Sequence, residues 1–258
     1  SPIIASFGLG GQFMLQWGEI GSTPRLYVSS YTSTGTPSGA PVELSRANFA
    51  LDGRLIPLGT GNGVLAIWVD ADDEPFRLRW QTLGGSLEPG PVGDIEYTGG
   101  FQVAPSGDRW VLVYSRPVEV QPDVSEERLF YGTIDANGVL SEVSSWDNTL
   151  GGEVADQAPI RVLPQDDQLV LFWREDWASG GDNSALLSRI IDVQGTAIDE
   201  PIEFLNSQDS PTLSNPINFY VEELVDGGFF GFVLGASIDD VFYLGRLNGD
   251  SDFMCFSP

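Results

Sequence analysis

The sequence contains no histidine, no lysine and a single cysteine, and each of these shortages excludes a kind of chemistry. Histidine is the commonest general base and metal ligand, so its absence excludes a Ser-His-Asp triad and a Cys-His pair. Cys255 has no second cysteine with which to form a disulfide inside the chain. Carboxylates are therefore the main groups left for acid–base chemistry.

Positive charge and long hydrophobic runs are also scarce. Only 12 basic residues, all arginine, stand against 37 acidic ones, and the net charge is −25. Such a surface repels phosphate backbones and anionic lipid, so we expect no nucleic-acid binding. No apolar run approaches the roughly 18 residues of a membrane helix, and we expect no transmembrane segment.

What the sequence does contain is a repeat of short apolar segments, at intervals of 46 to 61 residues. Each is almost continuously hydrophobic, which is typical of strands buried on both faces. Trp17, Trp68 and Trp173 recur at the same position of the repeat, so we expect all three in the core. The five segments are Phe13–Trp17, Val64–Trp68, Trp110–Tyr114, Leu169–Trp173 and Phe230–Leu234.

Around each apolar segment the pattern predicts three further strands, separated by turns rich in Gly and Asp. Four strands per repeat resemble the blade of a β-propeller, without the motifs of a named propeller family. We therefore predict an all-β fold, a five-bladed β-propeller of four-stranded antiparallel blades. Two stacked β-sandwich domains are the rival, but they would not produce five similar units. The prediction is a single domain over residues 1–258, with blades at about 1–46, 47–98, 99–157, 158–215 and 216–258.

The loops between the second and third strands of the repeats are rich in acidic residues. In a propeller these loops share one face, which usually carries the function. Clustered carboxylates suit calcium, the one cofactor that we consider, although a solvated acidic rim is the simpler interpretation. The candidate metal ligands are Asp70, Asp72, Asp73, Asp239 and Asp240.

Three aromatic residues, Tyr97, Trp146 and Trp177, fall in segments that the pattern assigns to loops on the same face. Exposed aromatic rings suit stacking on sugars or anchoring a protein partner. The alternative is that they pack over the bases of the loops.

The expected function rests on the innermost strands, where propeller glycosidases carry their acids. Among the segments predicted for these strands, only Phe219–Glu223 contains carboxylates. We therefore predict a non-catalytic binding or scaffold protein that recognises another protein or a glycan. The alternatives are a carboxylate-dependent carbohydrate-active hydrolase and a structural subunit that binds partner subunits in a larger assembly.

The chain begins Ser1-Pro2 rather than with methionine, which fits either removal of a signal peptide or a trimmed sequence. Together with the acidic composition, this leads us to expect a secreted, periplasmic or cell-surface protein.

The excess of acidic charge predicts a strong dependence of stability on salt. Folding brings carboxylates together, and their repulsion is screened over about 8 Å at 0.15 M salt but over about 3 Å at 1 M. The melting temperature should therefore rise with NaCl. If calcium sites exist, millimolar CaCl₂ should raise it well beyond NaCl of equal ionic strength. Equal shifts in the two salts would leave only the solvated rim, and no shift in either would contradict the electrostatic argument.

Overall fold

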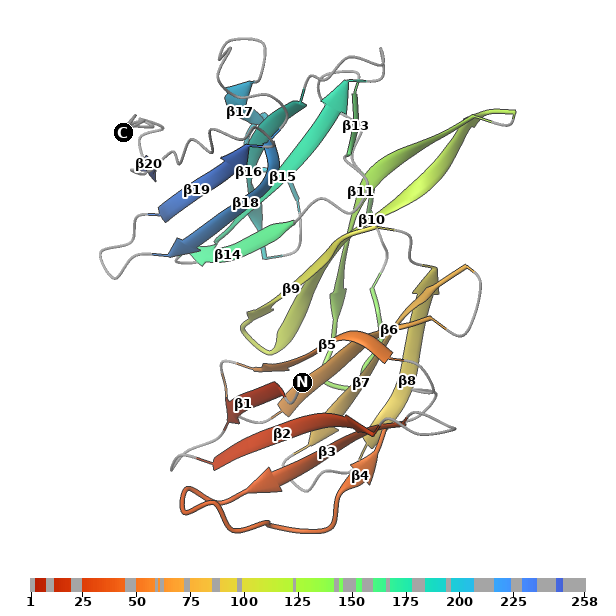
Figure 1. Ribbon diagram of the computed structural model, residues 1–258, viewed down its shortest axis with the longest axis vertical. Helices are drawn as coiled ribbons and strands as arrows, with labels where there is room; N and C mark the ends of the chain where they lie inside the picture. The colour runs from red at the N-terminus through yellow and green to blue at the C-terminus, as the bar shows by residue number, and fades with distance from the viewer. Residues whose placement is uncertain are drawn as a thin grey trace. The chain divides into compact units, whose positions relative to one another are not determined.

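The computed structural model is built of β-strands, and it contains no helix in the residues that it describes (Figure 1). None of these residues therefore forms a helix that could cross a membrane. The described residues are 3–7, 12–19, 25–44, 50–58, 60, 63–71, 75–84, 89–96, 99–122, 124–141, 144–145, 152–154, 160–165, 168–177, 184–193, 196–206, 216–223, 229–235 and 245–247.

Within these residues the strands form five sheets, taken here in chain order. The first contains β1 (Ile3–Phe7), β2 (Gln12–Glu19), β3 (Arg25–Tyr31) and β4 (Val42–Glu43). The second contains β5 (Ala50–Pro57), β6 (Gly63–Asp70), β7 (Arg77–Gly84) and β8 (Pro89–Glu96). The third contains β9 (Phe101–Ser106), β10 (Arg109–Gln121), β11 (Val124–Ile134) and β12 (Ser144–Ser145). The fourth contains β13 (Gly152–Val154), β14 (Arg161–Gln165), β15 (Gln168–Trp177), β16 (Ser184–Asp192) and β17 (Ile202–Asn206). The fifth contains β18 (Pro216–Glu223), β19 (Phe229–Gly235) and β20 (Gly245–Leu247).

Four of the sheets are meanders, because strands that follow one another in the chain lie side by side in them, and the fourth departs from this order at β13 and β14. The five repeated apolar segments all fall on the second long strand of a sheet, namely β2, β6, β10, β15 and β19. Their pairings with the flanking strands are antiparallel, for example β5 with β6 and β6 with β7. The predicted all-β class with four-stranded antiparallel sheets is therefore confirmed. The segment predicted as the third strand of the fifth repeat, Val241–Leu244, lies outside the described residues.

The fourth sheet has one strand more than the others. The short strand β13 pairs with the end of β15, and β14 pairs with the beginning of β15. Because β16 occupies the other edge of β15, β13 and β14 lie end to end along the same edge. The fourth sheet thus takes in Gly152–Val154, which the sequence pattern assigns to the third repeat.

The described chain divides into two compact units. The first comprises residues 1–98, 103–112 and 132–143, and the second comprises residues 99–102, 113–131 and 144–258. The first two sheets belong to the first unit and the last two to the second, while strands of the third sheet contribute to both. The closure of all the sheets into one ring stays a prediction.

The turn after the third strand has the same construction in three sheets. Thr32, Asp135 and Asp192 each use a side-chain oxygen to accept a hydrogen bond from the backbone N–H four residues later, at 2.8–3.2 Å. Gly35 and Gly138 have a φ of 81° in two of these turns, a conformation that favours glycine. The polar residue and the glycine at fixed spacing therefore explain why this turn recurs at the sequence level.

Long aromatic side chains connect neighbouring sheets within each unit. In the first unit, Trp80 Nε1 on β7 donates to the carbonyl oxygen of Gly138, in the turn after β11, at 3.0 Å. In the second unit, the Tyr131 hydroxyl on β11 donates to the carbonyl oxygen of Val193, in the turn after β16, at 3.3 Å. Gly93 lies opposite Trp80 on β8, where an added Cβ would overlap the indole ring. The aromatic ring thus reaches the next sheet across a position that carries no side chain.

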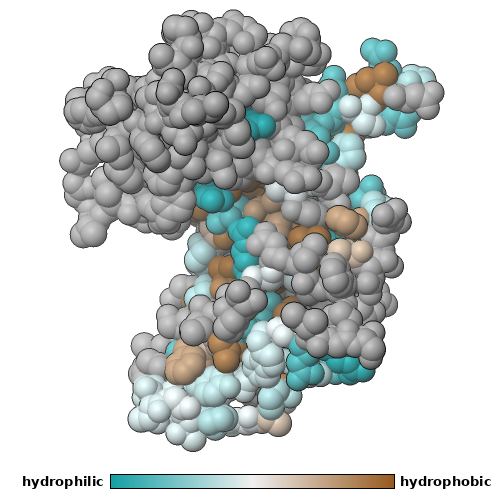
Figure 2. All heavy atoms as spheres, viewed as in Figure 1, coloured by the Kyte–Doolittle hydropathy of each residue, from teal (hydrophilic) through white to brown (hydrophobic). Residues whose placement is uncertain are grey.

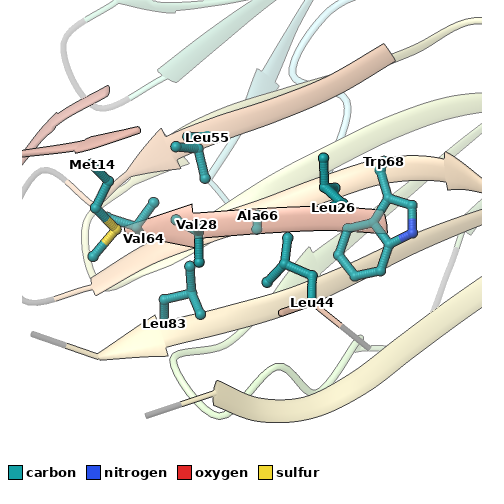
Figure 3. Close-up of a cluster of buried hydrophobic side chains, with 9 residues drawn as sticks. All are labelled: Met14, Leu26, Val28, Leu44, Leu55, Val64, Ala66, Trp68 and Leu83. Atoms are coloured by element: carbon teal, nitrogen blue, oxygen red, sulfur yellow. The ribbon is translucent and has the colours of Figure 1, made fainter. Parts of the chain in front are cut away.

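The core of the first unit lies between the facing sides of the first and second sheets (Figure 3). Met14 on β2 and Val28 on β3 are fully buried, as are Val64 and Trp68 on β6. All eight residues of β6 but the first are buried, so both faces of this strand are covered. The apolar second strand is therefore buried as predicted in this sheet. The cluster consists of Met14, Leu26, Val28, Leu44, Leu55, Val64, Ala66, Trp68 and Leu83.

The prediction that Trp17 belongs to the core is wrong. Trp68 and Trp173 are 0% and 3% exposed, but Trp17 is only half-buried and stacks on Tyr27 of β3, with ring centroids 5.8 Å apart. The reason is the environment of β2, whose buried residues alternate with half-buried ones. Met14 and Gln16 lie on its covered face, whereas Trp17 lies on the other face.

The third sheet carries an extended arm. Strands β6 and β2 end two residues after their aligned Trp68 and Trp17, but β10 continues for seven residues beyond Tyr114. With β11 it forms a long hairpin whose end combines hydrophobic and hydrophilic residues (Figure 2, upper right). Val124 at this end is 48% exposed. The segment that was expected to be an acidic loop is therefore a β-hairpin.

Replacing Trp68 by alanine should lower the free energy of unfolding by about 3–5 kcal/mol, because the fully buried indole would leave a cavity between two sheets. Trp17→Ala is the matched control and should cost clearly less, since Trp17 occupies the same position in the repeat but is half-buried. Denaturant unfolding of both variants measures the difference. An equal loss of unfolding free energy in the two variants would contradict the burial of β2 on one face only.

Candidate functional site

A carboxylate stands two positions after the aligned tryptophan in three of the five repeats, as Glu19, Asp70 and Glu175. All three lie on the second long strand of their sheet rather than in the loop that follows. Glu19 is exposed, but Asp70 and Glu175 are only 3% and 2% exposed. A solvated acidic rim therefore does not describe the last two residues, and each needs a partner inside the protein.

Glu175 obtains a partner from its own strand. The Nε1 of Trp173 donates a hydrogen bond of 3.0 Å to Glu175 Oε1. The two residues are two apart on β15, so they lie on the same face of the strand. The carboxylate is thus held at the end of β15 where β13 and β16 flank it, opposite Val154 and Ala185.

Asp70 obtains a partner from the neighbouring strand. The Nε of Arg79 on β7 lies 2.9 Å from Asp70 Oδ2, and both side chains are about 5% exposed. The buried indole N–H of Trp68 has no hydrogen-bond partner among the described residues. Arg79 is the register partner of Trp68, whereas the register partner of Trp173 is Leu187, so the equivalent position of the fourth sheet holds no guanidinium and Glu175 accepts from its tryptophan instead.

The third repeat has an arginine in place of the acid. The Arg116 guanidinium lies over the Phe130 ring, 4.1 Å from its centroid, and Phe130 also stacks on Tyr114. Burial raises the pKa of the Tyr114 phenol, and the nearby Arg116 charge lowers it in part. At this position the base of the hairpin arm is therefore held by an aromatic–cation stack.

The pairing of β13 with β15 brings three acidic residues together. Glu153 lies directly opposite Asp176, and the buried Glu175 is next in line. Trp177 lies directly opposite Gly152, one position further along. Side chains alternate between faces, so Glu153 and Asp176 share one face of the sheet, while Glu175 and Trp177 share the other. We take these four residues as the candidate site.

The expectation that only the last innermost strand carries carboxylates does not hold. Strand β5 begins at Ala50 and so includes Asp52, at the irregularity in its pairing with β6 between Leu51 and Arg54. Strand β13 places Glu153 on the edge of β15 that also holds β14. A glycosidase is therefore not excluded by a lack of acids on these strands, because the observed strand bounds include Asp52 and Glu153.

The predicted site residues have different outcomes. Trp177 is the last residue of β15, in the candidate site, and Asp70 is the buried partner of Arg79. Tyr97, Trp146, Asp72, Asp73, Asp239 and Asp240 lie outside the described residues. No three acidic or cysteine side chains that could hold a metal lie together among the described side chains. Calcium binding and the roles of the aromatic residues stay predictions.

Sequence reasoning missed Glu153 altogether and treated Glu175 and Asp176 as part of an acidic loop. The recurrence of an acid two positions after the aligned tryptophan is a signal that points to Glu175. No such signal exists for Glu153, which lies opposite Asp176, 23 positions further along the chain, only through the register of β13 and β15.

A hollow lies in the first unit, between turns of the second and third sheets. Its volume is about 290 Å³, with Leu58, Leu83 and Trp110 among its apolar lining residues. Trp110 is fixed there, because its Nε1 donates to the carbonyl oxygen of Ile56 at 2.9 Å. Asp108 is the one ionisable residue of the lining, so the hollow lacks a pair of acids.

Comparison with solved structures identifies the fold. The chain is similar to the β-propeller domain of the Trilobed protease from Pyrococcus furiosus, with 7% identity over 99% of this chain and 71% of that chain and a TM-score of 0.57. It is also similar to an ulvan lyase, a polysaccharide lyase bound to -[GlcA(1-4)Rha3S]-, with 9% identity, 99% and 68% coverage and a TM-score of 0.60. A third similar structure is the α-L-arabinanase of Penicillium chrysogenum complexed with arabinobiose, with 10% identity, 99% and 91% coverage and a TM-score of 0.56. No family model and no curated protein match the sequence.

These similarities confirm the predicted β-propeller fold. They contradict the prediction of a non-catalytic binding or scaffold protein, because the solved structures with this fold include a polysaccharide lyase and an arabinanase. The prediction was wrong for two reasons. It gave too much weight to the absence of histidine and lysine, and it took the innermost strands to be shorter than they are.

Removing Asp70 should be costly, because it would leave the buried Arg79 guanidinium without its carboxylate. We expect Asp70→Ala to lower the free energy of unfolding by about 3–5 kcal/mol. Asp94→Ala is the matched control: it breaks the Arg77–Asp94 pair, whose side chains are 32% and 34% exposed, and should cost about 1 kcal/mol or less. Thermal or denaturant unfolding measures both, and similar losses would show that burial of the pair does not matter.

Proposed function

We propose that this protein is a carboxylate-dependent carbohydrate-active hydrolase whose acids are Glu153 and Asp176. The single observation that carries the proposal is their register: the two residues are directly opposite each other on adjacent antiparallel strands. Residues in such positions have Cβ atoms about 4.5–5.5 Å apart. Carboxyl groups attached at such positions can adopt the separations of about 5–10 Å that glycoside hydrolases use.

Two acids so placed can divide the work of cleaving a glycosidic bond. Adjacent carboxylates repel each other, and retention of one proton between them removes that repulsion. The protonated acid then donates its proton to the glycosidic oxygen as the sugar departs. The other carboxylate attacks the anomeric carbon or removes a proton from the attacking water. This chemistry requires no histidine, lysine or cysteine, which agrees with the composition of the chain.

The neighbouring residues of β15 belong to the other face of the sheet. Trp177, opposite Gly152 in the register, lies on the face of Glu175 and not on that of Glu153 and Asp176, so the proposal assigns it no stacking on a sugar held between the two acids. Glu175, buried and bound by Trp173, fixes the end of β15 from the other side of the strand and so acts as a positioning residue.

The comparisons support the same class of activity. An arabinanase complexed with arabinobiose and an ulvan lyase bound to its saccharide share the fold of this chain. The partner that we propose is accordingly a glycan. We further propose that this glycan is extracellular, which corresponds to a secreted, periplasmic or cell-surface location for the protein.

Glu153→Gln and Asp176→Asn should each lower the rate of glycan hydrolysis by about 10²–10⁴-fold, because each removes one acid–base group while keeping its shape. Release of reducing ends from arabinan and levan, followed over a range of pH, measures the effect. Glu19→Gln is the matched control, since Glu19 ends the equivalent strand of the first sheet but has no acid opposite it. Full activity in either of the first two variants, with folding intact by circular dichroism, would contradict the assignment.

A further inference from the structure

The acidic charge is distributed unevenly over the chain. The unit that contains β13, β15 and β16 holds 24 of the 37 acidic residues and 6 of the 12 arginines, a formal charge of −18. The other unit holds the remaining 13 acidic residues and 6 arginines, a formal charge of −7. The candidate site therefore lies in the much more negative part of the protein.

The arginines of the strands around the site already have partners. Arg189 on β16 donates from Nε to the carbonyl oxygen of Asp199 at 2.9 Å, and its Nη2 lies 4.0 Å from Glu200. Arg161 on β14 donates from Nη1 to the carbonyl oxygen of Ile160 at 3.1 Å, and Arg174, next to Glu175 on β15, is also engaged in an interaction. Proteins bind carboxylate and sulfate groups through arginine forks or lysines, and the chain has no lysine at all. The described strands of the site thus offer no cation dedicated to an acidic sugar.

We infer that this site selects glycans that carry no acidic groups, and that it discriminates against uronic-acid and sulfated polymers. The inference rests on the proposed function and adds the substrate class to it. Fold similarity does not decide this point, because the fold is shared with an ulvan lyase bound to a glucuronic-acid saccharide and with an arabinanase complexed with arabinobiose.

The physical cause of this selectivity is the negative electrostatic potential of the unit that contains β13, β15 and β16. A cleft lined by charge of one sign changes the local concentration and the association rate of a charged ligand by about 10–10³-fold, and it does so less as ionic strength rises. An anionic polymer brings many negative charges towards a unit of charge −18. A neutral polymer brings none and is insensitive to the field. The discrimination should consequently be large in dilute salt and small in concentrated salt.

The test uses a matched pair of polymers, arabinan and the same arabinan lightly carboxymethylated. At 10 mM NaCl, where the screening length is about 30 Å, we expect kcat/KM for the carboxymethylated polymer to be at least about tenfold lower. At 1 M NaCl the ratio should fall to about twofold or less. Circular dichroism at each salt concentration controls for folding, and retardation in native gels that contain each polymer measures binding without cleavage.

The outcomes separate the two proposals. Equal rates on both polymers at 10 mM NaCl, or faster cleavage of the anionic one, would overturn the inference and leave the proposed hydrolase intact. Retardation by neutral arabinan alone, without cleavage, would support the selectivity and count against the hydrolase. Absence of both cleavage and retardation would overturn the two together.

Discussion

The burial of β6 on both faces is the constraint on which the rest of the first unit depends. A strand covered on only one side would alternate apolar and polar residues, but Gly63–Asp70 must present hydrophobic side chains in both directions. Val64, Ala66 and Trp68 therefore meet the first sheet, and the sheets can pack only in a stack. The hydrogen bonds of Trp80 and Trp110 to backbone of neighbouring sheets then set how the layers align.

Stacked sheets bury polar atoms where strands end, and each acid buried there needs a partner inside the protein. An acid two positions beyond the aligned tryptophan is free to face solvent in the first sheet, but in the second and fourth it is enclosed. Asp70 is compensated by a guanidinium, and Glu175 by an indole N–H. The residue on the neighbouring strand, Arg79 in the second sheet and Leu187 in the fourth, thus decides whether this position forms an ion pair or a carboxylate that accepts from an indole N–H.

The candidate site arises at a break in the edge of the fourth sheet. Strand β13 is separate from β14 there, whereas Ala50 and Leu51, which pair with the same part of β6, belong to the continuous strand β5. Strand β13 pairs with the end of β15 that holds Glu175 and Asp176. Placing Glu153 opposite Asp176 is unfavourable for stability, since like charges in that position repel each other. Local arrangements that cost stability are expected at functional sites, which is why this ladder, rather than the apolar hollow of the first unit, carries the proposal.

The sequence by itself determined the all-β class, the five second strands and the recurrent turns, because apolar runs, glycines and turn-forming side chains act over a few residues. It also determined the negative field, which follows from composition alone. Only the tertiary structure decided that Trp17 is half-buried while Trp68 is enclosed, and that Glu153 meets Asp176. Those outcomes depend on which sheet covers a face and on the register between strands distant in the chain, and neither is encoded in a local pattern.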